Sequence, residues 1–265
     1  MLGAIIGDVV GAKFEFGPIK TTDFPLFSEG CRFTDDTVMT IAVSHALMDS
    51  QGKTDEEIKQ ALIDSMKHYG HLYPYAGYGG SFGAWLNSDD NKAYNSFGNG
   101  SAMRVSSVGW LYPTLEETLK MAKLTAEVTH NHPEGIKGAQ ATAAAIFLAR
   151  NKTPKNEIKE YIEKTFGYNL NFTLDEIRPD YDFDITCQGS VPEAIKCFLE
   201  ANSFEETIRL AISLGGDADT QGAISGSIAE AYYDIPEAIA KRVIDFIPEN
   251  FVDQVKRLKE FYIKK

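Results

Sequence analysis

Apolar residues recur along most of the chain at intervals of three and four, the spacing that places them on one face of an α-helix. One such stripe comprises Ile58, Ala61, Leu62 and Met66. Alternating runs of the kind that mark β-strands are scarce. From this pattern we predict helices over residues 1–12, 35–49, 101–111, 133–150, 190–200, 219–232, 236–246 and 248–263.

Further helices are predicted by capping boxes, in which a hydroxyl accepts from the first turn and a glutamate reaches back. The pairs are Thr54 with Glu57, Thr114 with Glu117, and Ser203 with Glu206. Gly70 and Gly215 stand where helix-ending glycines belong. Thr153 followed by Pro154 predicts a cap and a first-turn proline.

The stretch 139–149 is so rich in alanine that we expect a closely packed central helix there. Residues 169–186 are the least helical part, and we predict a loop or a short extended segment. The chain has no internal repeat and no low-complexity linker. We therefore predict one all-α domain, a compact helical bundle over residues 1–265.

Charge narrows the classes of partner. The formal net charge is −12, which disfavours binding to DNA or to an anionic membrane unless a basic patch intervenes, and we find none. In the most basic stretch, 256–265, basic residues alternate with apolar ones, as expected for the solvated face of a last helix. The N-terminal apolar run lacks the basic start of a signal peptide, and no run approaches the ~18 apolar residues of a membrane span. Cys31, Cys187 and Cys197 form no CxxC pair, and we interpret them as reduced thiols of a cytoplasmic protein.

Two acidic segments are the strongest candidates for chemistry: TDDT at residues 34–37 and GGDADT at residues 215–220. One such segment alone is typical of a helix N-cap. Two of them together supply hard oxygen ligands suited to Mg²⁺ or Mn²⁺. If they meet in the folded chain, charges ~4 Å apart repel by about 4 kcal/mol. Such a site requires protons or divalent cations, although the sequence alone does not say whether the segments meet.

Four weaker patterns accompany these segments. The run FGNGSAMR at residues 97–104 offers small residues and free amides to a ligand, and a plain turn is the alternative. The glycines of residues 75–82 are a similar pattern. His130 and His132 lack the HExxH spacing of a zinc site. We therefore predict that one of them donates a hydrogen bond to a phosphate and that the other has a structural hydrogen-bonding role. Asp8, in an apolar run flanked by glycines, needs a buried hydrogen-bond partner.

Taken in order, these blocks resemble the ADP-ribosylglycohydrolase family, which includes the dinitrogenase reductase-activating glycohydrolases. The resemblance runs from Gly3 to about Tyr233. It rests on five segments in order: GAIIGDVVGAKFE, FTDDT, GNGSAMR, THNHPEG and GGDADTQGAISG. The last of these with an upstream TDDT is a highly specific combination.

The resemblance implies an all-α fold with two divalent cations, Mg²⁺ or Mn²⁺, in a cleft. Matching positions would be metal ligands at Thr34, Asp35, Asp36, Asp217, Asp219 and Thr220, with Asp219 bridging. Catalytic acids would be Glu15, Asp36 and Asp219. Substrate would be bound by Gly98, Asn99, Gly100, Ser101 and His130. Gly79, Gly80 and Phe82 correspond only loosely to another substrate loop.

The activity implied is metal-dependent hydrolysis of the bond between ADP-ribose and a modified target. By analogy with the family we expect a protein side chain, arginine before serine, and a monomeric enzyme. Alternatives are a small conjugate such as O-acetyl-ADP-ribose, an inactive relative that binds ADP-ribose, and an amidohydrolase or phosphohydrolase on the same fold. A terpenoid synthase is disfavoured, because Met39 stands where its DDxxD motif needs aspartate.

Overall fold

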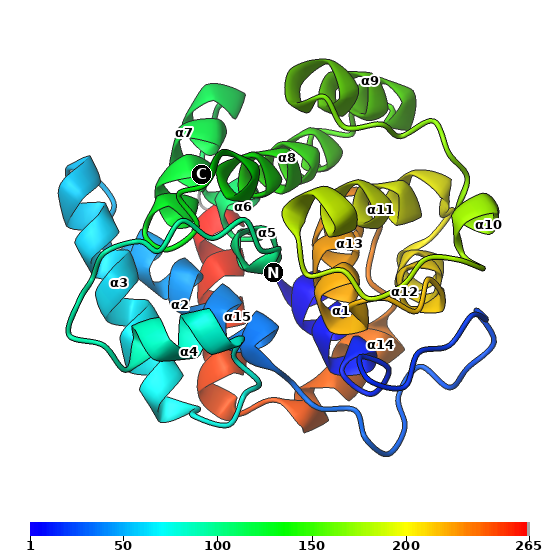
Figure 1. Ribbon diagram of the computed structural model, residues 1–265, viewed down its shortest axis with the longest axis horizontal. Coiled ribbons are helices and arrows are strands. Elements are labelled where there is room, and N and C mark those ends of the chain that lie inside the picture. Colours follow the sequence, from blue (N-terminus) through cyan, green and yellow to red (C-terminus); the bar gives the residue numbers. More distant parts are fainter. Residues whose placement is uncertain (264–265) are drawn as a thin grey trace.

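Helices make up the regular structure of residues 1–263, the part of the chain that the computed structural model describes (Figure 1). No strand occurs in this part; an isolated bridge pairs Gly98 with Thr186. The helices are α1 (Leu2–Gly11), α2 (Asp35–Asp49), α3 (Asp55–Leu72), α4 (Gly80–Leu86), α5 (Gly100–Met103), α6 (Val108–Leu111), α7 (Leu115–Glu127), α8 (Pro133–Arg150), α9 (Lys155–Phe166), α10 (Leu174–Ile177), α11 (Cys187–Glu200), α12 (Phe204–Ser213), α13 (Ala218–Tyr232), α14 (Glu237–Val243), the 3-10 turn η1 (Ile244–Phe246) and α15 (Glu249–Ile263). The predicted all-α class is confirmed.

Helices α1 and α13 lie against each other near the middle of the molecule (Figure 1). Glycines on both helices bring the backbones into direct contact. A β-carbon on Gly7 would lie 1.9 Å from the carbonyl oxygen of Gly222, and one on Gly3 would lie 2.2 Å from that of Gly226. No side chain fits at either position, so these glycines set the distance between the two helices.

The alanine-rich helix α8 packs against α5, α6, α7, α9, α11 and α13, which confirms the predicted central helix. Its buried face consists largely of alanine, so neighbouring helices approach closely. A β-carbon on Gly109 of α6 would lie 2.4 Å from Ile146 of α8. Small residues therefore determine the spacing here as well.

The predicted helix over 101–111 is wrong. The structure has two short helices, α5 and α6, separated by residues 104–107. At the break the side chain of Arg104 turns into the protein and donates hydrogen bonds to the carbonyl oxygen of Thr125 and the hydroxyl of Thr129. The helix predicted over 236–246 likewise becomes α14 followed by a 3-10 turn.

Several predicted helix ends also differ. Gly215, with φ +67°, follows the end of α12 as predicted. Gly70 lies inside α3 and ends nothing; a β-carbon there would lie 2.7 Å from Leu86. Residues 169–186 contain the unpredicted helix α10, which starts with a complete capping box of Thr173 and Glu176. Pro154 is itself the N-cap of α9, without a side-chain cap bond.

The predicted capping boxes form to different extents. Thr54 and Glu57 make both hydrogen bonds. The hydroxyls of Thr114 and Ser203 also accept from the first turn, but their glutamates bond to neighbouring groups instead of the N-cap amide. The helix starts are nevertheless those predicted.

The last helix, α15, carries the basic C-terminal stretch, of which Lys264 and Lys265 lie outside the described residues. Lys256 and Arg257 form ion pairs with Asp253 and Asp49, as expected for a solvated face. None of the described helices combines the length and hydropathy that crossing a bilayer requires.

The contact between α1 and α13 predicts a strong effect of one methyl group. Gly7→Ala should lower the free energy of unfolding by at least about 2 kcal/mol, because the new β-carbon overlaps backbone atoms that cannot move independently. The matched control is Gly83→Ala within α4, where the nearest neighbour of a β-carbon would be the Tyr78 side chain at 3.9 Å. That variant should be neutral or stabilised by up to about 1 kcal/mol. Urea unfolding of both variants tests this, and equal midpoints would contradict it.

Candidate active site

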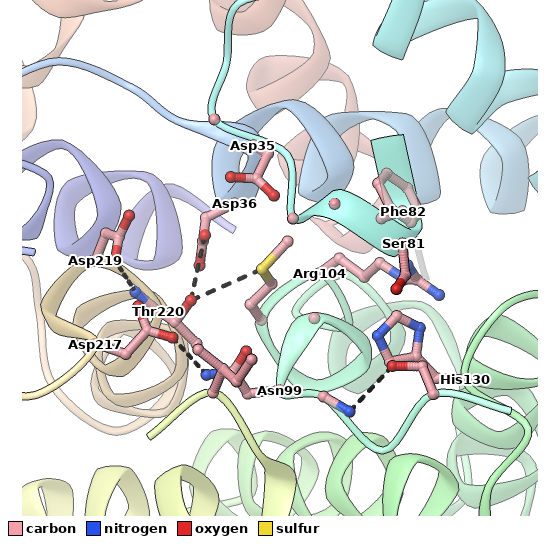
Figure 2. Close-up of a pocket in the computed structure, with 18 of the residues that line it drawn as sticks. Asp35, Asp36, Ser81, Phe82, Asn99, Arg104, His130, Asp217, Asp219 and Thr220 are labelled. Carbon is pink, nitrogen blue, oxygen red and sulfur yellow. Dashed lines mark hydrogen bonds between the residues drawn. The ribbon is translucent and has the colours of Figure 1, made fainter. Parts of the chain in front are cut away.

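The two acidic segments meet in one cleft (Figure 2). Asp35 and Asp36 occupy the first turn of α2, while Asp217 is the N-cap residue of α13 and Asp219 lies in its first turn. The hydroxyl of Thr220 donates to Asp36 Oδ2 at 3.3 Å, which joins the segments directly. The convergence that the sequence left open therefore occurs.

Asp8 of α1 holds the first segment in place. Its carboxylate accepts from the amide of Thr34 at 3.0 Å, the hydroxyl of Thr34 at 2.6 Å and the amide of Thr37 at 3.0 Å, and also from the hydroxyl of Thr37. These bonds satisfy a fully buried acid, as burial in an apolar run requires. Asp8 was not among the predicted site residues, although an acid between two glycines in an apolar run already indicated a special role.

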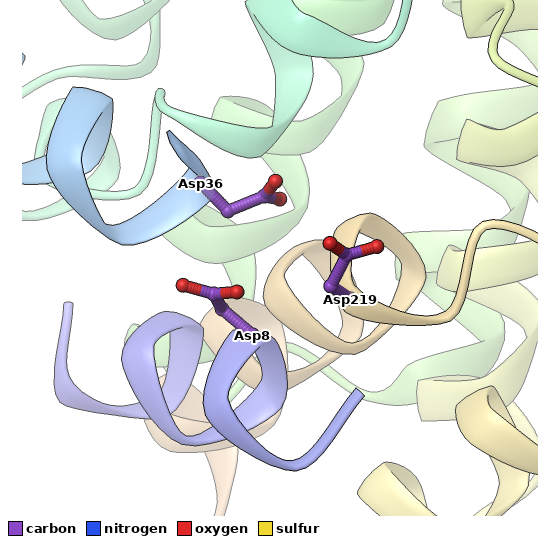
Figure 3. A group of neighbouring side chains, drawn as sticks. All are labelled: Asp8, Asp36 and Asp219. Carbon is purple, nitrogen blue, oxygen red and sulfur yellow. The ribbon is translucent and has the colours of Figure 1, made fainter. Parts of the chain in front are cut away.

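Asp8 also belongs to a set of converging acids. One oxygen from each of Asp8, Asp36 and Asp219 lies within 4.8 Å of the others, and the three residues come from α1, α2 and α13 (Figure 3). A second set comprises Glu15, Asp217 and Asp219. Asp219 is thus common to both sets, which is the position expected of a shared ligand.

The charges of this cluster strongly perturb one another. Burial and the repulsion of Asp219 raise the pKa of Asp35 to about 8, and they raise the pKa of Asp36 well above its usual value. Burial raises the pKa of Asp217 to about 6, opposed by hydrogen bonds that include one from Asn99. Burial and Asp217 also raise the pKa of Asp219. At neutral pH the cluster favours bound protons or cations.

One oxygen in the cluster has no protein partner. Asp36 Oδ1 is buried, and no hydrogen-bond donor reaches it from the described residues. Buried carboxylate oxygens are normally paired. Since the surrounding ligands are carboxylate and hydroxyl oxygens, the donor set fits a hard divalent cation such as Mg²⁺ or Mn²⁺.

Glu15 lies just beyond α1 and belongs to the second set of acids, with Asp217 and Asp219. Its carboxylate is partly buried. Burial and the charge of Asp219 raise its pKa to about 7, although Arg32 opposes the shift. A carboxyl group that titrates near neutrality can both give and take a proton under ordinary conditions.

The glycine run near residue 98 lies along one wall. The Asn99 amide donates to Ile185 at 2.8 Å, and Asn99 Nδ2 donates to Asp217 at 2.6 Å. Asn99 therefore supports the acid cluster with its side chain. The hydroxyl of Ser101 points away from the cleft and donates to the carbonyl of Gly135 at 2.7 Å. Gly98 and Gly100 line the cleft.

The opposite end of the cleft is not acidic. Arg104 and His130 lie there, across from the aspartates (Figure 2). Burial, followed by the charge of Arg104, lowers the pKa of His130 well below its usual value, so the imidazole is neutral. His132 has the structural role predicted for one of the two histidines: its Nδ1 accepts the amide of Glu134 as the N-cap of α8.

The remaining walls include residues that the sequence analysis did not single out. The cleft has a volume of about 390 Å³, within the range of small-molecule sites. Gly79, Gly80 and Phe82 line it, as the loose correspondence suggested. Additional lining residues are Phe16, Ser81, Tyr94, Ser96, Phe183 and Ile185. These residues are isolated in the sequence and form no motif that could have marked them.

Comparison with known proteins identifies the family to which the chain belongs. The sequence profile of the family described as ADP-ribosylglycohydrolase matches residues 1–262. This chain belongs to the ADP-ribosylglycohydrolase family. The resemblance drawn from the five sequence segments is therefore confirmed.

Relatives within the family differ in the activities their names state. A mouse protein named ADP-ribosylhydrolase ARH3 is 28% identical over 90% of this chain and 84% of its own length. A Pseudomonas putida protein named ADP-ribosylarginine hydrolase Tri1 is 26% identical over 91% of this chain and 72% of its own. A solved structure titled ADP-ribosylglycohydrolase-related protein complex shares the fold at a TM-score of 0.67 with 22% identity, covering 99% of this chain and 94% of that one.

The acid cluster predicts that metal removal destabilises the protein. A cation that binds only the folded state stabilises it by about 2.7 kcal/mol at 100 times its Kd. EDTA should therefore lower the melting temperature of metal-loaded protein, and Asp219→Asn should remove most of that sensitivity because Asp219 belongs to both acid sets. An unchanged melting curve for a sample shown to contain metal would count against the prediction.

The raised pKa values predict the pH dependence of metal-free protein. An acid whose pKa is raised on folding stabilises the folded state when protonated, and that stability is lost as pH rises towards the folded value. In EDTA, the free energy of unfolding should fall from about pH 4 to about pH 8, the range set by Asp217, Glu15 and Asp35. Asp217→Asn should flatten the fall up to about pH 6. Urea titrations across this range would contradict the account if both proteins gave the same slope.

Proposed function

We propose that this protein hydrolyses the glycosidic bond between ADP-ribose and a modified protein side chain, with arginine the favoured acceptor and serine the next. The observation that carries the proposal is the convergence of Asp35, Asp36, Asp217 and Asp219 in one cleft of an ADP-ribosylglycohydrolase. Relatives named for hydrolysis of ADP-ribosylated targets, including arginine, support the substrate class.

Two divalent cations complete the proposed site. Thr34, Asp35 and Asp36 would hold one, and Asp217 and Thr220 the other, with Asp219 shared. The unpaired oxygen of Asp36 and the membership of Asp219 in both acid sets support the roles of these two residues, and Asp217 belongs to one set. Asp35 lies outside both sets, and family resemblance alone assigns Asp35, Thr34 and Thr220. When bound, such cations orient sugar hydroxyls and lower the pKa of water.

The protein's own groups then have separate tasks. Asp8 fixes the loop of residues 34–37, so the ligand oxygens are positioned before substrate arrives. Glycosidic cleavage develops positive charge on the sugar, which the surrounding carboxylates stabilise. Glu15, which belongs to the second acid set beside Asp217 and Asp219, would transfer a proton to the leaving group or from the attacking water.

Substrate binding would extend from the acids to the opposite wall. The distal ribose would lie at the aspartates and the diphosphate along Gly98, Asn99 and Gly100 towards His130, as family resemblance implies. The contrast between an acidic end and a neutral or cationic end supports this direction. The hydroxyl of Ser101 would not bind the substrate, because it donates to the carbonyl of Gly135 inside the protein. Ser101 would serve only as part of the short helix α5.

Compartment and assembly belong to the same proposal. A cytoplasmic protein is favoured by Cys31, Cys187 and Cys197, which are free thiols. We expect the monomer to be the active form, by analogy with the family.

A substrate panel tests the proposed activity. With Mg²⁺ or Mn²⁺, the protein should release ADP-ribose from arginine-modified peptide, more slowly from serine-modified peptide, and not from either after EDTA treatment. O-acetyl-ADP-ribose in the same panel covers the small-conjugate alternative. Turnover of that ester alone would replace the protein-linked substrate, and binding of ADP-ribose without any turnover would identify an inactive relative.

Glu15→Gln separates catalysis from packing. The variant keeps size and hydrogen bonding but loses the titratable proton, so kcat should fall by ~10²–10⁴. Affinity for ADP-ribose should stay within about tenfold, a change of about 1.4 kcal/mol. The loss of this titratable group should also change the shape of the wild-type rate profile against pH.

Asp36→Ala provides the contrast, because loss of a proposed metal ligand should weaken metal content and ADP-ribose affinity together. Measuring kcat, metal content and melting temperature on the same preparations compares the two roles. Wild-type kcat in Glu15→Gln at saturating metal would remove Glu15 from the catalytic residues.

A further inference from the structure

Arg104 is a buried cation that forms no ion pair with any described residue. Its side chain is 1% exposed, and burial lowers its pKa only to about 10, so it keeps its charge at neutral pH. Nη2 donates to the carbonyl of Thr125 at 3.0 Å and to the hydroxyl of Thr129 at 2.7 Å. Burying a guanidinium without an ion-pair partner is costly even where hydrogen bonds satisfy part of it.

The Thr129 hydroxyl links Arg104 to His130, which lines the active-site cleft. Its oxygen lies 2.7 Å from His130 Nδ1. A guanidinium can only donate, so Thr129 accepts from Arg104. The hydroxyl proton has no other acceptor among the described residues than His130 Nδ1, and that nitrogen must therefore carry a lone pair. In a neutral imidazole the proton then lies on Nε2.

Nε2 faces the glycine wall of the cleft. A β-carbon on Gly100 would lie 3.2 Å from this nitrogen, and one on Gly98 would lie 3.6 Å from it. The two glycines keep the space in front of Nε2 free of side chains. A ligand oxygen in the cleft can therefore approach the N–H directly.

We propose that Arg104, acting through Thr129, fixes His130 as the Nε2–H tautomer and thereby makes it a hydrogen-bond donor to an anionic oxygen of the ligand. Arg104 and Thr129 are positioning residues, since they act through His130. The inference rests on the proposed function, in which that oxygen belongs to the diphosphate of ADP-ribose. The other tautomer would present a lone pair to the same oxygen and repel it.

Nitrogen NMR of the ligand-free protein tests the tautomer without relying on any activity. Uniformly ¹⁵N-labelled wild type should give His130 one pyrrole-type Nε2 and one pyridine-type Nδ1, assigned by loss of the signals in His130→Gln. Thr129→Ser keeps the hydroxyl and should keep this pattern. Thr129→Val removes it and should give a mixture of tautomers. A protonated Nδ1 in wild type, or an unchanged pattern in Thr129→Val, would overturn the proposal.

Calorimetry with ADP-ribose tests the consequence for binding. Thr129→Val should bind about five- to tenfold more weakly, the scale of one hydrogen bond, while Thr129→Ser should stay within about twofold of wild type. In a His130→Gln background, Thr129→Val should have no additional effect. Equal weakening in both backgrounds would show that Thr129 acts independently of His130 and would overturn the proposal. Absence of binding by wild type would instead contradict the proposed function, and the NMR result would still decide the tautomer.

Discussion

Helices α1 and α13 contact each other through their backbones, and the active site depends on that contact. Gly3 and Gly7 lie against Gly226 and Gly222, at distances that no side chain could occupy. The same two helices carry Asp8 and Asp219, whose oxygens lie within 4.8 Å of each other and of an oxygen of Asp36. Larger residues at the glycines would separate these acids. The close packing therefore holds like charges near one another against their mutual repulsion.

Two ends of opposite character result in one cleft. At one end, burial and mutual repulsion raise the pKa values of the aspartates, and Asp36 keeps an unpaired oxygen. At the other end lie a buried guanidinium and a neutral imidazole. A ligand with hydroxyl groups near one end and an anionic group near the other would match both. ADP-ribose has this form, which is why the geometry and the family membership support the same substrate class.

Much of this could be predicted from sequence, for physical reasons. Helical periodicity and N-cap residues are local, so most helices and both acidic segments were placed correctly. Tertiary contacts were not predicted: at the break in the helix predicted over 101–111 the side chain of Arg104 bonds to Thr129, and Gly70 lies inside α3 against the side chain of Leu86. Asp8 and Asn99 support the acids through contacts with residues distant in the sequence. No spacing rule reveals such partners, and the metal and catalytic roles of individual residues stay predictions.

The central claim is that the converging acids form a centre for two cations. Anomalous scattering from a crystal soaked in Mn²⁺ tests this most directly, because it locates the ions independently of any assay. The account predicts two peaks ~3.5–4 Å apart, one beside Asp36 and one beside Asp217, with Asp219 between them. The crystal should be soaked at a Mn²⁺ concentration that saturates the protein in solution. If the carboxylates are ordered and neither position is then fully occupied, the claim is contradicted.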